Sequence, residues 1–234
     1  MRDRKTVAIF VDAGFFTRMF TAKIDPCMKL SPESLAKKMW GYWMCHVNKK
    51  AGEELYRIYF YDCPPLMEKS QHPITNKPID FAKSELSKYK NDLIDALLKR
   101  PYVATRMGEL STIDKEWGFK RDSSKKIKKM FRGELLAGEI DPNDIVIKPR
   151  QKGVDMKLGI DISCVVLKGF ANKIVLISGD SDFVPAAKLA RTEGAHFVLD
   201  AMGRSVNGAL SRHIDGLKTF INRPRYTTEQ KEPV

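Results

Sequence analysis

The sequence predicts an α/β protein with a central parallel sheet. Short apolar runs at residues 6–11 and 174–177 have the length and the β-branched content of buried strands. Segments with helical periodicity separate these runs from one another. Strands that alternate with helices in this way are typical of parallel sheets with right-handed crossovers.

The elements can be placed in chain order from their apolar patterns. The first helix is expected to begin at Ser31, which offers an N-cap, with Pro32 at the first helical position, and Gly52 closes that stretch. The helix expected from about Gly153 to Gly169 has apolar residues on nearly every side, so we expect it to be deeply buried. The other expected helices cover 81–100, 183–193 and 206–213, and the strands cover 6–11, 55–61, 102–107, 145–147, 173–177, 196–199 and 218–221.

The 234 residues are interpreted as a single domain over residues 1–221. A polar, weakly periodic stretch at about 108–143 is interpreted as a basic insertion with a short helix. The connection at 62–78 contains four prolines, and a loop of this length is usually functional or mobile. The polar residues 222–234 lack apolar periodicity, which predicts a disordered tail.

The net charge of +12 comes from 41 Lys and Arg against 29 Asp and Glu, and the excess is concentrated. Seven basic residues fall between Lys120 and Arg132, and Lys148, Arg150, Lys152 and Lys157 follow. A nucleic acid is the expected polyanionic partner. A solvated basic helix face that only aids solubility is the alternative.

Other features of the sequence narrow the setting of the protein. No apolar run approaches the roughly 20 residues needed to span a bilayer, so no membrane partner is expected. The four cysteines are scattered without CxxC spacing, which argues against a zinc ribbon or a disulfide framework and favours a reducing cytoplasm. A homodimer is compatible with the sequence.

Four carboxylates follow predicted strands or begin a helix at the same expected edge of the sheet: Asp12, Asp155, Asp180 and Asp182. Each alone has a structural explanation, since Asp182 could cap the next helix and Asp155 could offset a helix dipole. Together, carboxylates about 4 Å apart repel by about 4 kcal/mol per pair at an effective dielectric near 20. Such a cluster protonates or holds a cation.

Oxygen ligands favour Mg²⁺ or Mn²⁺ over zinc, and such an ion can support displacement at a phosphodiester. Competing chemistries fit less well. The four histidines lie near no nucleophile motif. An aspartyl-nucleophile phosphatase would need a second acid where Gly14 stands, and a receiver domain fits poorly with the basic insertion.

Three segments carry a resemblance to a known family: V-A-I-F-V-D-A-G-F-F (7–16), K-G-V-D-M-K-L-G-I-D (152–161) and V-L-I-S-G-D-S-D-F-V-P (175–185). In that order they resemble the NYN domain family, PIN-like proteins of the LabA-like group. The later segment G-A-H-F-V-L (194–199) extends the resemblance. It implies a PIN-like three-layer α/β/α fold and a metal-dependent ribonuclease activity.

By matching position, the resemblance implies that Asp12, Asp155, Asp180 and Asp182 bind the metal. Ser178 would orient them or a metal-bound water, Lys152 would meet a phosphate, and Asp161 would have a supporting role. Many members have Asn about four residues after the first Asp, where this chain has Phe15 and Phe16. We therefore expect an aromatic ring there to stack on a base. The complete set of expected substrate-binding residues is Lys152, Lys157, Phe16, Arg204, Lys125 and Lys126.

The sequence thus supports two hypotheses from different classes. The first is a metal-dependent ribonuclease, most simply an endoribonuclease, that hydrolyses RNA through the cluster of aspartates with Mg²⁺ or Mn²⁺. The second is an RNA-binding adaptor without turnover that uses the basic insertion.

Overall fold

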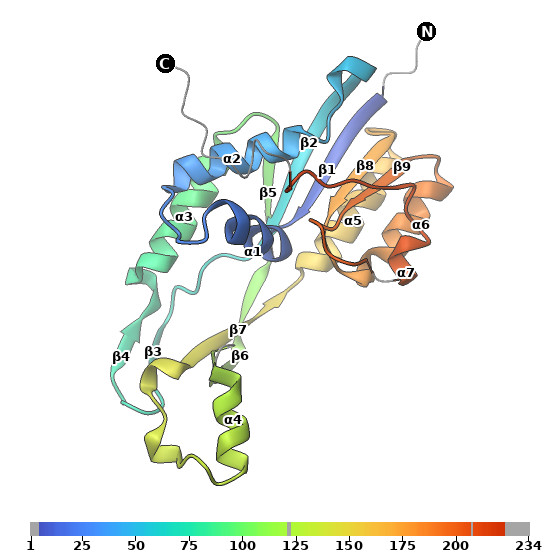
Figure 1. The fold of residues 1–234 in the computed structure, drawn as a ribbon. Coiled ribbons are helices and arrows are strands. Elements are labelled where there is room, and N and C mark those ends of the chain that lie inside the picture. The colour runs from blue at the N-terminus through green and yellow to red at the C-terminus, as the bar shows by residue number, and fades with distance from the viewer. Residues whose placement is uncertain (1–4, 121–122, 207, 223–234) are drawn as a thin grey trace.

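A six-stranded parallel sheet forms the centre of the computed structural model, which describes residues 5–120, 123–206 and 208–222 (Figure 1). The strand order is β10-β9-β8-β1-β2-β5, and every neighbouring pair is parallel. The strands of this sheet are β1 (Lys5–Asp12), β2 (Glu53–Asp62), β5 (Val103–Met107), β8 (Lys173–Ile177), β9 (His196–Asp200) and β10 (Gly216–Leu217).

Helices cover both faces of the sheet, because its central strands are apolar on both sides. Val7, Ile9 and Val11 of β1 pack into one core, and Ala8 and Phe10 pack into the other. The first core includes α1 (Ala13–Ile24), α2 (Pro32–Met44) and α3 (Glu85–Leu98), and the second includes α5 (Val154–Leu167), α6 (Val184–Thr192) and α7 (Gly208–Ser211). The three-layer α/β/α architecture is therefore confirmed.

A two-stranded antiparallel ribbon leaves the sheet after β5, and we call residues 109–152 the arm. It consists of β6 (Glu109–Phe119), α4 (Ser124–Phe131) and β7 (Ile145–Lys152), with α4 at its far end (Figure 1). The small hairpin of β3 (Lys69–Gln71) and β4 (Pro78–Asp80) lies beside the arm, where His72 contacts Pro142 and Trp117. Gly108 allows close packing at the base of the arm. A Cβ atom there would lie 2.5 Å from Val154 Cγ2 and 2.9 Å from Cys63 Sγ.

Several elements differ from the prediction. Helix α1 was not expected, because it follows strand β1 without a connecting loop and has Gly14 as its second residue. Strand β6 was missed because its pairing partner β7 lies beyond α4 and the ribbon is polar. The last strand is Gly216–Leu217, so the prediction of a strand at 218–221 is wrong.

The predicted deep burial of α5 is also wrong. Met156, Ile160 and Leu167 are 72%, 54% and 60% exposed. The buried side of the helix includes Leu158 and Ile162, which are four residues apart and face the sheet. A sequence that is apolar around the whole helix thus covers the sheet with one side only.

Some of the expectations fall on residues that the structure does not describe, namely residues 223–234 of the predicted tail and Arg121 of the basic run. All four cysteines are free thiols. In the described part of the chain, no helix has the length and apolar character needed to cross a membrane.

Candidate active site

The carboxyl ends of β1 and β8 meet at the point where the chain reverses its winding direction. The two strands are neighbours, with Val11 opposite Ile177. After β1 the chain enters α1 on one face of the sheet, and after β8 it enters α6 on the other face. In open α/β sheets, ligands bind in the crevice that such a divergence creates.

Asp12 ends β1 and caps α1 at this point. Its Oδ1 atom accepts a hydrogen bond of 3.1 Å from the backbone N–H of Phe15, and its Oδ2 atom accepts one of 3.0 Å from the Ser178 hydroxyl. Burial raises the pKa of Asp12, and the nearby charge of Asp180 adds to this, although the two hydrogen bonds act in the opposite direction. The net effect is a raised pKa, which means that the folded protein disfavours the ionised form of Asp12.

Asp180 and Asp182 follow β8 in the loop that leads to α6. Asp180 is the N-cap of a short 3₁₀ turn, Ser181–Phe183, and its carboxylate accepts a hydrogen bond of 3.0 Å from the backbone N–H of Asp182. The capping role considered for Asp182 therefore belongs to Asp180, because the turn begins at Ser181, two residues before the expected start of the helix. Both carboxylates are exposed.

Asp155 enters from the opposite layer, in the first turn of α5. The residue before the helix, Gly153, is its N-cap and has a φ of 78°, a left-handed conformation that favours glycine. Although Asp155 lies at the surface, partial desolvation raises its pKa, and the charges of Asp12, Asp180 and Asp182 raise it further. Asp155 is thus close enough to the other three acids for their charges to repel its own.

The repulsion between the acids bears on whether they could bind a divalent cation. Among the residues that the structure describes, no three Asp, Glu, His or Cys side chains converge tightly enough to form a ready-made metal cluster. The coupling is electrostatic: the charge of Asp180 adds to the effect of burial on the pKa of Asp12, and the charges of Asp12, Asp180 and Asp182 add to the effect of desolvation on the pKa of Asp155. A divalent cation relieves such repulsion, and an oxygen-only donor set fits Mg²⁺ or Mn²⁺.

Two arginines join the acids in a cavity of about 600 Å³. Arg18 and Arg204 line it together with Asp12, Asp180 and Phe15. Arg204 was expected to contact substrate, whereas Arg18 was missed because α1 was not recognised. A helix capped by Asp12 puts Arg18 one turn beyond Gly14, on the same side. The cavity therefore presents both carboxylates and guanidinium groups.

The prediction that Phe16 stacks on a base is wrong. Phe16 is 0% exposed and packs against the rings of Phe20, Tyr42 and Trp43, with centroids 5.0, 5.7 and 5.4 Å away. Its neighbour Phe15 is the residue at the site. A Cβ atom on Gly179 would lie 2.7 Å from the Phe15 ring, so that ring fixes the path of the loop after β8.

The expected lysines divide into two groups. Lys152 ends β7 directly before Gly153, and the Lys157 ammonium donates a hydrogen bond of 2.8 Å to the Met107 carbonyl, so both lie at the start of α5 near Asp155. Lys125 and Lys126 belong to α4, at the end of the arm and away from the carboxyl ends of β1 and β8 (Figure 1). The structure does not bring these two residues to the acids.

Asp161 is held apart from the four acids. Its carboxylate accepts hydrogen bonds of 2.8 Å from the Tyr61 hydroxyl and 3.1 Å from Arg106 Nε. These bonds connect α5 to strands β2 and β5. Its contacts are those of a residue that positions the helix.

One comparison with known proteins, a match to a family model, agrees with the resemblance found in the sequence. The family model described as NYN domain matches residues 118–217, a span that includes Asp155, Ser178, Asp180 and Asp182 but not Asp12. A crystal structure of a protein of unknown function from Vibrio parahaemolyticus is 11% identical, with a TM-score of 0.46, and the alignment covers 93% of this chain and 94% of that one. No protein with a curated description matched the chain.

Proposed function

Because residues 118–217 match the NYN domain, a PIN-like nuclease family, we propose that this chain is a metal-dependent ribonuclease that hydrolyses RNA phosphodiester bonds. One observation carries the proposal. Asp12, Asp155 and Asp180 lie at the switch point of the sheet. Burial and the charge of Asp180 raise the pKa of Asp12, and desolvation and the charges of Asp12 and Asp180 raise the pKa of Asp155. Carboxylates held together in this way are suited to a cation and, through it, to a phosphate.

The four acids have distinct positions in the proposed site. Mg²⁺ or Mn²⁺ held by Asp12, Asp155, Asp180 and Asp182 would neutralise charge on the phosphate and lower the pKa of an attacking water. Ser178 keeps the Asp12 carboxylate in one orientation through its hydrogen bond to Oδ2. Asp180 is in turn held by capping the turn that follows it.

The basic residues around the acids would hold the RNA backbone. Arg18 and Arg204 line the same cavity as Asp12 and Asp180. A guanidinium group binds a phosphate through two parallel hydrogen bonds, which fixes the position of the scissile bond. Lys152, at the end of β7, would contact a phosphate on the side of α5.

The proposal is tested by incubating the protein with single-stranded and structured RNA in Mn²⁺, and separately in EDTA. Cleavage in Mn²⁺ that EDTA abolishes is the expected result. RNA with Mn²⁺ but without protein controls for hydrolysis by the ion itself. Equal cleavage in EDTA would exclude a metal-dependent mechanism.

The exposed surface of α4 favours a second candidate, an RNA-binding adaptor without turnover. Lys125, Lys128 and Lys129 are exposed, and Phe131 is 90% exposed at the end of the same helix. Ammonium groups that contact phosphates beside an aromatic ring that stacks on a base are typical of single-strand binding. The arm presents this helix away from the acids (Figure 1).

The two candidates are separated by replacing Lys125, Lys128 and Lys129 with alanine. If α4 binds RNA, the slope of log affinity against log salt becomes shallower by about 0.7 for each phosphate that the variant no longer neutralises. The double variant Lys37→Ala, Lys38→Ala on the exposed side of α2 is the control. The adaptor requires this shallower slope together with no cleavage in Mn²⁺, and an unchanged slope contradicts it.

A further inference from the structure

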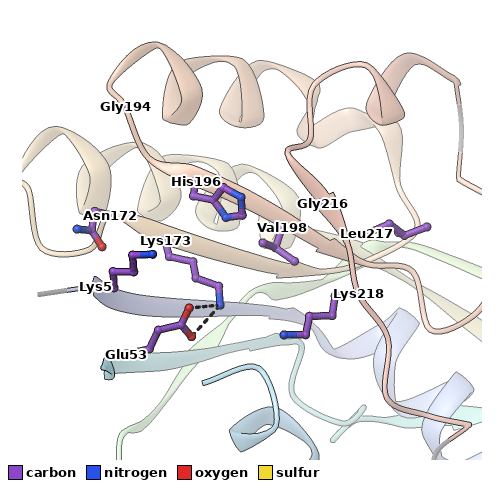
Figure 2. A pocket seen from close by; sticks show the side chains of 10 residues that line it. All are labelled: Lys5, Glu53, Asn172, Lys173, Gly194, His196, Val198, Gly216, Leu217 and Lys218. Carbon is purple, nitrogen blue, oxygen red and sulfur yellow. Dashed lines mark hydrogen bonds and ion pairs between the residues drawn. The ribbon is translucent and has the colours of Figure 1, made fainter. Parts of the chain in front are cut away.

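A second cavity lies at the opposite edge of the sheet, where the parallel strands begin. Its volume is about 460 Å³, within the range of small-molecule sites. The first residues of four strands line it (Figure 2): Lys5 of β1, Glu53 of β2, Lys173 of β8 and His196 of β9. We call it the amino-edge cavity.

The only carboxylate among the residues that line the amino-edge cavity is already neutralised. Both Oε atoms of Glu53 accept hydrogen bonds of 2.8 Å from the Lys173 ammonium, which also donates to the His46 carbonyl at 3.2 Å. Lys173 is 8% exposed, so this pair forms the floor of the cavity (Figure 2). Because Glu53 and Lys173 neutralise each other, the pair contributes no net charge to ligand binding.

Two further ammonium groups stand at the rim. Lys5 and Lys218 are exposed and line the same cavity, and within the described ranges neither makes an ion pair. Lys218 packs over the Phe220 ring, 5.3 Å from its centroid, and its charge helps to lower the pKa of Glu53. Among the described residues that line the amino-edge cavity, positive charges therefore outnumber negative ones by two, which favours an anionic ligand.

The remaining wall is suited to a flat, weakly polar group. Val198 and the exposed His196 imidazole lie on the sheet face that Lys173 occupies, whereas Leu217 pairs with Leu199 and its side chain points to the other face (Figure 2). A ligand that fills the cavity thus needs an anionic end near Lys5 and Lys218 and a planar end against the His196 imidazole. We propose that the amino-edge cavity binds a nucleoside monophosphate group, either a free nucleotide or the phosphorylated end of an RNA.

Calorimetric titration of the whole chain in EDTA tests this proposal. The probes are adenosine 5′-monophosphate, inorganic phosphate and adenosine. The wild type is expected to bind the monophosphate more tightly than either fragment, because only this probe uses both ends of the cavity. The double variant Lys5→Ala, Lys218→Ala should bind it about tenfold more weakly or worse, the loss expected for charge-assisted hydrogen bonds.

The control is Lys37→Ala, Lys38→Ala, which removes the same charge from the exposed surface of α2 and should leave the affinity unchanged. No detectable binding by the wild type overturns the proposal, and so does an equal loss in the control or no loss in the test variant. A 5′-phosphorylated trinucleotide that binds more tightly than the monophosphate identifies an RNA end as the ligand. Tighter binding of the monophosphate identifies a free nucleotide. Because Asp180→Asn should bind the monophosphate normally, failure here is distinguishable from failure of the ribonuclease proposal.

Discussion

The hydroxyl of Ser178 donates a hydrogen bond of 3.0 Å to Oδ2 of Asp12, across 166 positions of sequence. The bond joins the end of β8 to the end of β1. The same hydroxyl oxygen accepts a hydrogen bond of 3.2 Å from the backbone N–H of Asp180, and Ser178 is 0% exposed. One buried side chain thus connects the Asp12 carboxylate to the loop that carries two more acids.

Replacing Ser178 with alanine should lower RNA cleavage about tenfold, the loss that corresponds to one hydrogen bond of roughly 1.4 kcal/mol. The hydrogen bond lowers the pKa of Asp12. Its removal therefore raises that pKa further, and the acidic limb of the pH–rate profile should move to higher pH. Ser163→Ala is the control, since the Ser163 hydroxyl bonds only the Gly159 carbonyl of its own helix. A profile that keeps its acidic limb would show that Ser178 does not act on Asp12.

Replacing Asp155 with asparagine should stabilise the protein in EDTA while impairing cleavage. Desolvation and then the charges of the other acids raise the folded-state pKa of Asp155 above 3.8. Its ionised form therefore opposes folding at pH 7, and this cost disappears as the pH falls through the folded-state pKa.

Thermal unfolding at pH 7 and at lower pH measures this effect. Because Asp155 is partly screened by solvent, we expect a rise in Tm of roughly 1–3 °C at pH 7 that shrinks as the pH falls. Asp95→Asn on the exposed side of α3 should leave Tm unchanged. A lower Tm for Asp155→Asn at pH 7 would mean that repulsion among the acids is unimportant.

Gly179→Ala and Gly159→Ala should have opposite effects. A Cβ atom at Gly179 would lie 2.7 Å from the Phe15 ring, so the ring and the loop must shift, at a cost of about 1–3 kcal/mol. No atom lies within 4 Å of a Cβ atom at Gly159 in α5, so alanine there should stabilise the helix by about 0.5–1 kcal/mol. Urea unfolding measures both changes, and a neutral Gly179→Ala would contradict the tight contact with Phe15.

Glu53→Gln should destabilise the protein by about 3 kcal/mol at pH 7, because it leaves the Lys173 ammonium buried without its carboxylate. Burial alone would raise the pKa of Glu53, but the hydrogen bonds and the charge of Lys173 lower it below 4.5. The contribution of Glu53 is therefore complete above pH 4.5 and is lost as the pH falls through the lower folded-state pKa.

Urea unfolding at pH 7 and at about pH 3 follows this change. The difference between the wild type and Glu53→Gln should shrink at the lower pH. Glu193→Gln, at an exposed carboxylate after α6, is the matched control. A constant difference at both pH values would show that the ionisation of Glu53 does not contribute to stability.

The central parallel sheet and the proximity of Asp12 to Asp180 could be predicted from the sequence. Strands β1 and β8 contain continuous apolar runs, as expected for strands covered on both faces, and in a parallel sheet their carboxyl ends must lie at one edge. Asp12 and Asp180 follow two such strands. Their proximity therefore depends only on the two strands being neighbours.

Side-chain direction in the short elements could not be predicted from the sequence. Whether Phe15 or Phe16 faces the site depends on α1, a helix that no loop separates from β1. Because this helix was not predicted, Arg18 was not recognised as a residue of the site. Asp180 rather than Asp182 is the cap, because a turn begins at Ser181, two residues before the expected start of the helix. The pairing of β6 with β7 depends on contacts across α4, which local patterns do not contain.

Single-turnover cleavage of a labelled RNA in Mn²⁺ tests the central claim most directly. The comparison is between the wild type, Asp12→Asn and Asp180→Asn, with Asp95→Asn as the control and Tm measured for each. If these acids form the active site, the first two variants should lose about hundredfold or more in rate, roughly 3 kcal/mol of transition-state stabilisation, while the control keeps its rate. Undiminished cleavage by Asp180→Asn would contradict the account.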